Sequence, residues 1–261
     1  MENPVEDPTR GLAVQRLVTV RLARKKDAHF VHKLVGELAE YQRLASAFIA
    51  TEKELEDTLF NFPPYQGPTT FILESTVPNP ALDGSRATSG LPQQHLTADE
   101  GATMEQTRRS SAAGAEPSEV HAQEIILRHE ITDMAMDAYK CPGSDPNRVV
   151  VGFVLFFPNF STLVAKAGYY VEDLYIREPY RGHGFGTVLL KTVAQQALQR
   201  GAERLEWCVL DWDENALNFY KSLGAAVLPE WRICRLSGDA LKQCEAQLLH
   251  FTLQSPHHTT K

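Results

Sequence analysis

Three glycines at alternate positions, in the run Tyr180-Arg181-Gly182-His183-Gly184-Phe185-Gly186-Thr187, favour a tight turn. An apolar run typical of a buried strand precedes them at 169–176, and apolar residues recur with helical spacing over 187–200. Glycine lets a turn fold closely and bring its backbone N–H groups near a ligand, while the following helix dipole attracts anions. The order strand, glycine-rich turn, helix therefore predicts a phosphate-binding turn.

Two common nucleotide-binding folds contain such a turn and require further residues near it. A dinucleotide-binding fold needs an acidic residue at the end of the next strand, and a P-loop needs Gly-Lys followed by Ser or Thr. The next predicted strand, 204–210, does precede Asp211, but a different signature follows at 213–225, and the glycines are not followed by Gly-Lys. Neither fold is favoured. A flexible connection is the alternative explanation for the glycines alone.

Composition excludes several classes of protein. The chain has 261 residues, 43% of them hydrophobic, and a formal net charge of −7, which is typical of a soluble globular protein. This charge argues against general binding to nucleic acid or anionic membranes and is compatible with cationic small molecules. Four scattered cysteines suggest neither a disulfide framework nor a metal site. The polar N-terminus lacks a signal-peptide pattern and no apolar run reaches membrane-spanning length, so we expect the cytoplasm, with the nucleus left open.

Periodicity and capping residues predict the remaining elements. We expect strands at 17–23, 69–74, 149–157 and 204–210, helices after Asp27, from Thr51 to Asn61 and at 214–223, and a last strand pair near 226–228 and 232–236.

The expected domain organisation has one long interruption. A disordered leader covers 1–15, the domain covers 16–240, and a C-terminal tail, amphipathic at first and polar at its end, covers 241–261. The acidic segment 77–148 is poor in large apolar residues and is expected to be a largely disordered insertion between two strands. Its last part, 118–139, fits either a helix or a strand near 124–131.

A resemblance to a known family emerges from two motifs. Arg181-x-x-Gly184-x-Gly186, followed by Asn218-Phe219-Tyr220-Lys221-Ser222-Leu223-Gly224-Ala225, resembles the acetyl-CoA-binding core of the GNAT acetyltransferase superfamily. It covers residues 17–75 and 149–240. The resemblance implies an α/β GNAT fold, with a mixed, mostly antiparallel, splayed sheet flanked by helices.

Within that superfamily, the segments 171–176, 218–220 and 230–232 are most similar to the spermidine/spermine (diamine) and thialysine acetyltransferase branch. The implied activity is acetyl-CoA-dependent acetylation of a small primary amine by direct transfer, without a metal. A homodimer is implied by the resemblance only.

Acetyl transfer to an amine needs a bound and polarised thioester, a base for the ammonium and an acid for the departing thiolate. The predicted cofactor-binding residues lie in the turn, the strand before it and the second motif: Leu174, Ile176, Arg181, Gly182, His183, Gly184, Phe185, Gly186, Thr187, Asp213 and Lys221. Backbone N–H groups of the turn would hold the diphosphate, with Arg181 as a charged donor, and the N–H of Leu174 would donate to the thioester oxygen.

The resemblance implies that Tyr220 is the general acid and that Glu172 takes the amine proton through water. Adjacent residues of a regular strand point to opposite faces, so Glu172 and Asp173 would share one cleft only if a bulge interrupts the strand. Asp173 is then expected to hold a cationic substrate. The alternative is one exposed and one hydrogen-bonded carboxylate.

The predicted substrate pocket also includes Tyr41, Gln42 and Trp231. It departs from the branch pattern, which has Glu where Gln42 stands, an Asp and a Trp in the hairpin at 159–163, and Asn at position 213. These departures leave room for a smaller or less charged amine. Two other functions stay open: acetylation of protein lysines or N-termini, and a non-catalytic CoA-binding interaction module.

Overall fold

A six-stranded sheet in the order β3-β1-β2-β4-β5-β6 organises the larger of two units in this computed structural model. The structure describes residues 14–77, 119–127, 129–141 and 147–244, and the chain divides into units of residues 1–210 and 211–261. The strands are β1 (Val14–Leu22), β2 (Thr69–Thr76), β3 (Glu119–Leu127), β4 (Arg148–Ser161), β5 (Lys166–Ile176) and β6 (Leu205–Glu206). All pairings are antiparallel except that of β5 with β6.

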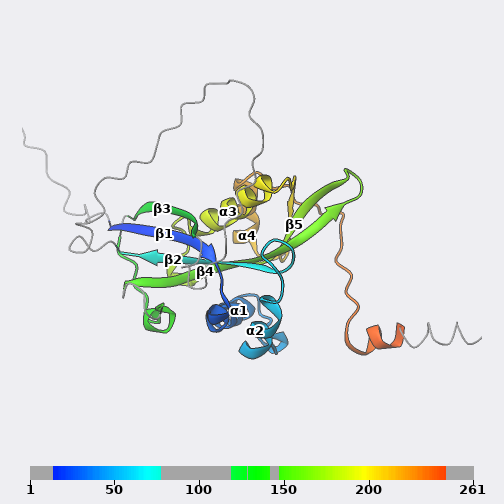
Figure 1. Cartoon of the computed structure of the whole chain (residues 1–261), viewed down its shortest axis with the longest axis horizontal. Helices are drawn as coiled ribbons and strands as arrows, with labels where there is room; N and C mark the ends of the chain where they lie inside the picture. The colour runs from blue at the N-terminus through cyan, green and yellow to red at the C-terminus, as the bar shows by residue number, and fades with distance from the viewer. Residues whose placement is uncertain (1–13, 78–118, 128, 142–146, 245–261) are drawn as a thin grey trace, which may run out of the picture. The chain divides into compact units, whose positions relative to one another are not determined.

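Helices cover both faces of this sheet. They are α1 (Ala28–Tyr41), α2 (Glu52–Leu59) and α3 (Phe185–Gln199), with short 3-10 turns η1 (Lys25–Asp27), η2 (Ala45–Ala47), η4 (Met136–Tyr139) and η5 (Glu178–Tyr180). Figure 1 shows α1 and α2 on one face and α3 on the other. Every residue of β2 is buried, because the strand lies in the middle of the sheet between two helical layers. The predicted α/β fold with a mixed, mostly antiparallel sheet is confirmed.

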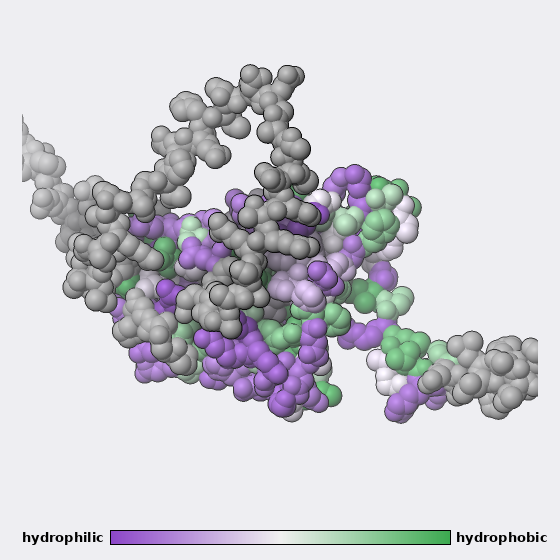
Figure 2. Space-filling view, in the orientation of Figure 1, coloured by the Kyte–Doolittle hydropathy of each residue, from purple (hydrophilic) through white to green (hydrophobic). Residues whose placement is uncertain are grey.

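The second helix begins at the capping box that the sequence predicts. The Thr51 side chain accepts a hydrogen bond from the Glu54 N–H at 3.2 Å, and the Glu54 carboxylate accepts one from the Thr51 N–H at 2.8 Å. These bonds satisfy backbone donors at the helix start. The outer surface over α2 is hydrophilic, whereas apolar residues gather at the tip of the β4–β5 hairpin, where Leu163 is 93% exposed (Figure 2).

The predicted insertion supplies part of the sheet. Residues 119–127 form β3, which pairs with β1 and becomes an edge of the sheet. The helix alternative for 118–139 is therefore wrong over β3, and the strand alternative overlaps only its second half. The burial of β3 alternates as in a strand, but the apolar residues of its sequence do not alternate regularly, so the sequence pattern alone does not separate strand from helix. Residues 1–13 and 78–118, on which the expected disorder mostly falls, lie outside the described residues.

The unit of residues 211–261 contains α4 (Glu214–Ser222) and a further helical stretch at 238–244. Gly224 has a φ of 87° just after α4, which matches its predicted role at the helix end. The last strand pair, expected near 226–228 and 232–236, is a correction: the structure assigns no strand there. A strand requires a hydrogen-bonded neighbour, and side-chain alternation alone does not supply one.

Candidate active site

Strands β5 and β6 separate soon after they meet. They pair in parallel only at Tyr169 with Leu205 and Tyr170 with Glu206, although β5 continues to Ile176. The strand expected at 204–210 is thus shorter than predicted. Because the other edge of β5 is hydrogen-bonded to β4, the β6 side beyond Tyr170 offers backbone groups to a ligand. This separation is the splay that the resemblance implied.

A β-bulge lies in β5 where the two strands separate. Leu155 of β4 pairs with Asp173, but the next residue, Phe156, pairs with Val171, so Glu172 is the extra residue. A bulge changes the direction of side chains that would otherwise alternate between the faces. The interruption that the sequence analysis required for Glu172 and Asp173 to act together is present.

The environment of Asp173 changes its ionisation. Burial, followed by the negative charge of Glu172, raises the pKa of Asp173 to about 6. Glu172 itself is exposed, while Asp173 is half-buried. A carboxyl group with a pKa near 6 exchanges protons close to neutral pH and gains from a nearby cation.

The glycine-rich turn adopts the backbone that its sequence predicts. Gly182 and Gly184 have φ angles of 76° and 86°, in a region that other residues rarely enter. Gly184 is the N-cap of α3, and no side chain caps this helix start. The first N–H groups of a helix need partners, and a phosphate can supply them. The turn therefore has the backbone of an anion-binding helix start, and its role toward acetyl-CoA stays a prediction.

Arg181 links the turn to the end of α1. Its Nε donates a hydrogen bond to the Ile176 carbonyl oxygen at 2.8 Å. Its guanidinium carbon lies 4.6 Å from the centre of the Tyr41 ring and 5.1 Å from that of Tyr175. The structure thus brings Tyr41, a predicted substrate residue, to the glycine-rich turn. Gln42 follows it as the C-cap of α1.

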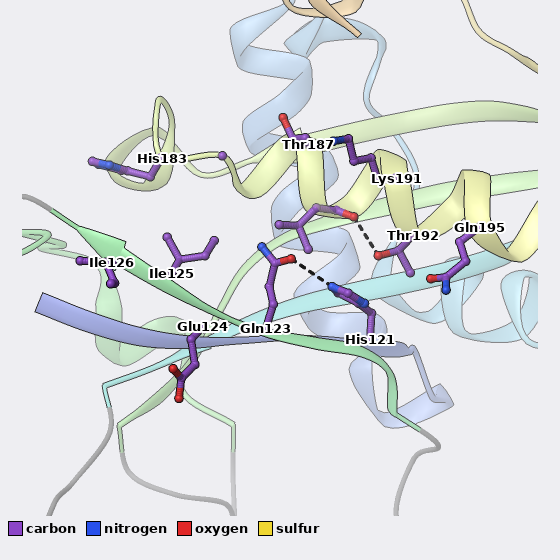
Figure 3. Close-up of a pocket in the computed structure, with 12 residues that line it drawn as sticks. His121, Gln123, Glu124, Ile125, Ile126, His183, Thr187, Lys191, Thr192 and Gln195 are labelled. Atoms are coloured by element: carbon purple, nitrogen blue, oxygen red, sulfur yellow. Dashed lines mark hydrogen bonds between the residues drawn. The ribbon is translucent and has the colours of Figure 1, made fainter. Parts of the chain in front are cut away.

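A groove of about 540 Å³ opens beside the turn, between β3 and one flank of α3. His121 and Gln123 point from β3 toward the helix, and Thr187, Lys191 and Gln195 follow that flank (Figure 3). The groove includes His183 and Gly184 of the turn, but neither Glu172 nor Asp173 lines it. Its lining mixes polar and apolar side chains, and β3 contributes residues that sequence reasoning did not single out.

The other predicted residues belong to the unit of residues 211–261. Asp213 is the N-cap of α4 and its carboxylate accepts from the Ala216 N–H at 3.0 Å. Tyr220 and Lys221 lie in the last turns of that helix. Trp231 lies beyond it, in a stretch without strand or helix. Their predicted roles toward cofactor and substrate stay predictions.

Sequence reasoning missed a cluster next to the turn. Glu37 of α1 accepts hydrogen bonds from the hydroxyls of Tyr139 and Tyr175. Asp133 accepts from Arg177 and Tyr180. Residues 133 and 139 lie in the predicted insertion, where no motif drew attention to them. Their importance is seen only in the structure, where they bond to residues far away along the chain.

These features define an α/β protein with a glycine-rich turn, a helix start that no side chain caps, and a splayed strand that carries two carboxylates. Residues 113–225 match the model of the acetyltransferase (GNAT) family. The chain is 41% identical over 224 residues to an L-ornithine N5-acetyltransferase of Arabidopsis thaliana, covering 85% of this chain and 86% of the relative. The chain belongs to the GNAT family and is an N-acetyltransferase, for which acetyl-CoA is the acetyl donor.

Two further relatives have other substrates in their names. A tyramine N-feruloyltransferase of Nicotiana tabacum is 29% identical over 232 residues, covering 87% of this chain and 90% of the relative. A thialysine N-epsilon-acetyltransferase of Bos taurus is 35% identical over 113 residues, covering 42% of this chain and 66% of the relative. Among the described residues, the structure has no cluster of metal-ligating side chains and no helix long and apolar enough to span a membrane.

Proposed function

We propose that this enzyme acetylates a small primary amine with a second polar or charged group, of the diamine or lysine-analogue type. The observation that supports it best is the pair Glu172 and Asp173 at the bulge, beside the gap between β5 and β6. Such a pair attracts an ammonium group and also accepts its proton. The named relatives act on ornithine, thialysine and tyramine, which are all small primary amines.

The proposed chemistry divides the work among four groups of this chain. Asp173 holds the substrate cation, and Glu172 takes a proton from the reacting ammonium through water. The N–H of Leu174 donates to the thioester oxygen, and the Tyr220 phenol gives its proton to the thiolate that leaves. Acetyl-CoA supplies the acetyl group as a thioester. The amine nitrogen attacks the carbonyl directly, so the C–N bond forms and the C–S bond breaks without an acyl-enzyme.

The test is thiol release from acetyl-CoA by purified protein across a panel of amines. The panel contains ornithine, thialysine, tyramine, spermidine and a lysine-containing peptide, each also assayed with feruloyl-CoA. We expect ornithine or thialysine with acetyl-CoA to give the highest kcat/KM. Preference for the peptide would contradict the proposed substrate class, and preference for feruloyl-CoA would contradict the proposed donor.

Two substitutions test the assigned roles. Glu172→Gln and Tyr220→Phe keep the shape of each side chain but remove the base and the acid. General acid–base catalysis typically contributes about 100- to 10,000-fold, so each variant should lose activity in that range. Serine in place of the exposed Cys208 is the matched control and should retain turnover, because direct transfer uses no thiol of the enzyme. Unchanged turnover in Glu172→Gln would remove that residue from the mechanism.

We also propose a homodimer in the cytoplasm, which rests on the resemblance to the diamine acetyltransferase branch. Light scattering of the eluting protein tests the first part. A mass of 29.2 kDa at micromolar concentration would contradict it.

A further inference from the structure

We propose that Asp133, between β3 and β4, is a positioning residue for cofactor binding, because it fixes the chain that leads into the phosphate-binding turn. The inference rests on the proposed use of that turn. Asp133 lies outside both sequence motifs and far along the chain from the glycines. Its carboxylate nonetheless connects the end of β5 to the start of α3 through two side chains, Arg177 and Tyr180.

The first connection is a buried, two-pronged ion pair. The Nη1 and Nη2 atoms of Arg177 donate to the two carboxylate oxygens of Asp133 at 2.7 and 2.9 Å. Both side chains are only 2% exposed. Paired bonds of this kind fix the orientation of the two groups as well as their distance. Asp133 therefore fixes the guanidinium rather than merely neutralising it.

Arg177 is also held at the exit from the sheet. Its N–H donates to the Val151 carbonyl oxygen at 2.9 Å, just beyond the last residue of β5. Its guanidinium carbon lies 3.6 Å from the centre of the Tyr139 ring, in a cation–π contact. The place where the chain leaves β5 is thus fixed by backbone, aromatic and carboxylate contacts.

The second connection reaches the helix. The Tyr180 hydroxyl donates to Asp133 at 3.0 Å, and the Tyr180 ring meets that of Phe185 edge-on, with 6.0 Å between centres. Phe185 is the first residue of α3 and is 1% exposed. Burial raises the pKa of Tyr180 to about 12, with the charge of Asp133 adding to it, so the hydroxyl stays a donor at neutral pH. The carboxylate therefore contacts two residues that precede Gly182, and one of them, Tyr180, packs against the first residue of the helix that follows it.

A parallel set of contacts anchors the same segment to α1. Tyr139 donates to Glu37, and Tyr175 donates to the other oxygen of that carboxylate at 3.1 Å. The Tyr175 ring in turn lies beside Arg181 of the turn. Residues 129–141 are therefore packed against α1 and against the segment that leads into the glycine-rich turn. Since a misplacement of about 1 Å can cost roughly 100-fold in activity, such supports affect binding at a distance.

A general loss of stability and a displaced turn give different kinetics. If Asp133 only stabilises the fold, its loss lowers the fraction of active enzyme, so kcat falls while both KM values stay the same. If Asp133 positions the turn, the loss weakens acetyl-CoA binding specifically. The KM for acetyl-CoA then rises, and the KM for the amine does not.

The experiment compares Asp133→Asn with Asp137→Asn in the full chain. Asp137 lies in the same segment, but its side chain is 88% exposed and pairs with Lys140 on the surface. We measure the Kd for CoA by calorimetry and both KM values. Asp133→Asn should raise the Kd for CoA and the KM for acetyl-CoA by about tenfold or more, with the amine KM within about twofold. Asp137→Asn should match the wild type in every readout.

Tyr180→Phe keeps the proposal testable if Asp133→Asn does not fold. It removes only the hydroxyl and retains the ring against Phe185, and it should raise the Kd for CoA by about threefold with a smaller loss of stability than Asp133→Asn. If Asp133→Asn folds and binds CoA as tightly as the wild type, the positioning role is overturned and the proposed function is left intact. If Asp133→Asn is unfolded, unchanged CoA affinity in Tyr180→Phe leads to the same conclusion. Absence of CoA binding in the wild type would overturn both.

Discussion

Arg21 on β1 donates from its Nε to the Oε1 of Glu74 on β2 across 2.7 Å, in the interior of the protein. The same guanidinium donates to both oxygens of Asp27, at 2.7 and 3.0 Å. The side chains are between 2% and 8% exposed. One cation thus satisfies two buried carboxylates that hold β1, β2 and the start of α1 together.

Loss of that cation should destabilise the fold severely. Arg21→Met keeps the aliphatic stem but leaves Asp27 buried without its ion-pair partner, and it leaves Glu74 with the more distant Arg148, at 3.4 Å, as its charge partner. Breaking a buried pair in this way costs about 3 to 5 kcal/mol, which is a large part of the stability of a typical domain. Urea denaturation of both proteins measures it. Gln15→Met, at an exposed bond to Glu124, is the control and should cost far less.

The same cluster predicts loss of stability in acid. Burial by itself would raise the pKa of Asp27, but the hydrogen bond and charge of Arg21 outweigh it, so this pKa lies below its ordinary value of 3.8. A carboxyl group with a lowered folded-state pKa stabilises the protein above its unfolded pKa and loses that contribution as the pH falls below it. The thermal midpoint of the wild type should therefore drop below about pH 4. In Asp27→Asn, whose midpoint is lower throughout, this component of the acid slope should be missing.

Asp173 predicts the opposite dependence. Its folded-state pKa of about 6 lies above the ordinary 3.8, so its contribution to stability is present below 3.8 and is lost as the pH rises through 6. Asp173→Asn should therefore raise the unfolding free energy at pH 8 by about 1 to 3 kcal/mol and change it little at pH 3.5. Denaturation at the two pH values measures the difference. A variant less stable than the wild type at pH 8 would contradict the assignment.

Substrate binding should depend on the same ionisation. If ionised Asp173 holds the amine cation, the KM for the amine should increase as the pH falls through about 6, while the KM for acetyl-CoA stays constant. Initial rates from pH 5 to 8 test it. In Asp173→Asn this rise of the amine KM at low pH should disappear, and the amine KM should be high at every pH. A rise that persists in the variant would assign the titration to another group.

The glycine turn allows a matched pair of substitutions. Gly184→Ala and Gly201→Ala both force alanine into positive φ, at 86° and 74°, and neither new methyl group meets an atom within 4 Å. Each should cost about 1 kcal/mol of stability through backbone strain. Only Gly184 lies at the start of α3, where we propose that the diphosphate binds, so only its substitution should raise the KM for acetyl-CoA. Equal kinetic effects in the two variants would contradict the role of the turn.

The cysteines should differ in reactivity. Burial, followed by the nearby charge of Glu74, raises the pKa of Cys141 to about 12, and its thiol donates to that carboxylate at 3.2 Å. Because the thiolate is the reactive form, Cys141 should resist iodoacetamide at pH 8 in the native protein, whereas exposed Cys208 reacts. Mass spectrometry of tryptic peptides after timed labelling measures the two rates. Rapid labelling of Cys141 would show that the Glu74 cluster opens readily.

Local signals explain what the sequence could predict. The positive-φ glycines, the Thr51–Glu54 capping box and the β4–β5 hairpin each depend on neighbouring residues, and each appears in the structure. The bulge at Glu172 was a requirement of the predicted chemistry rather than a visible pattern. Its presence supports the chemistry that required it.

Long-range pairing explains what the sequence could not predict. Asp133 meets Arg177 across 44 positions, and Glu37 meets Tyr139 across 102. Asp27 stands at the N-cap position of α1, where its side chain could cap the helix. Its carboxylate pairs with Arg21 instead and makes no capping hydrogen bond to α1. Where distant partners compete for a side chain, the local sequence pattern predicts the helix or strand but not the residue that the side chain contacts.

Strand β3 has a consequence for shortened versions of this enzyme. It occupies the outer hydrogen-bonding edge of β1, with eight residue pairs between 14–21 and 119–127. A deletion that removed 119–141 together with the rest of the insertion would leave the N–H and C=O groups of β1 bare, as a template for another chain. Trimming this protein to a minimal catalytic core would therefore favour aggregation, and it would also remove Asp133 from the chain that leads into the glycine-rich turn.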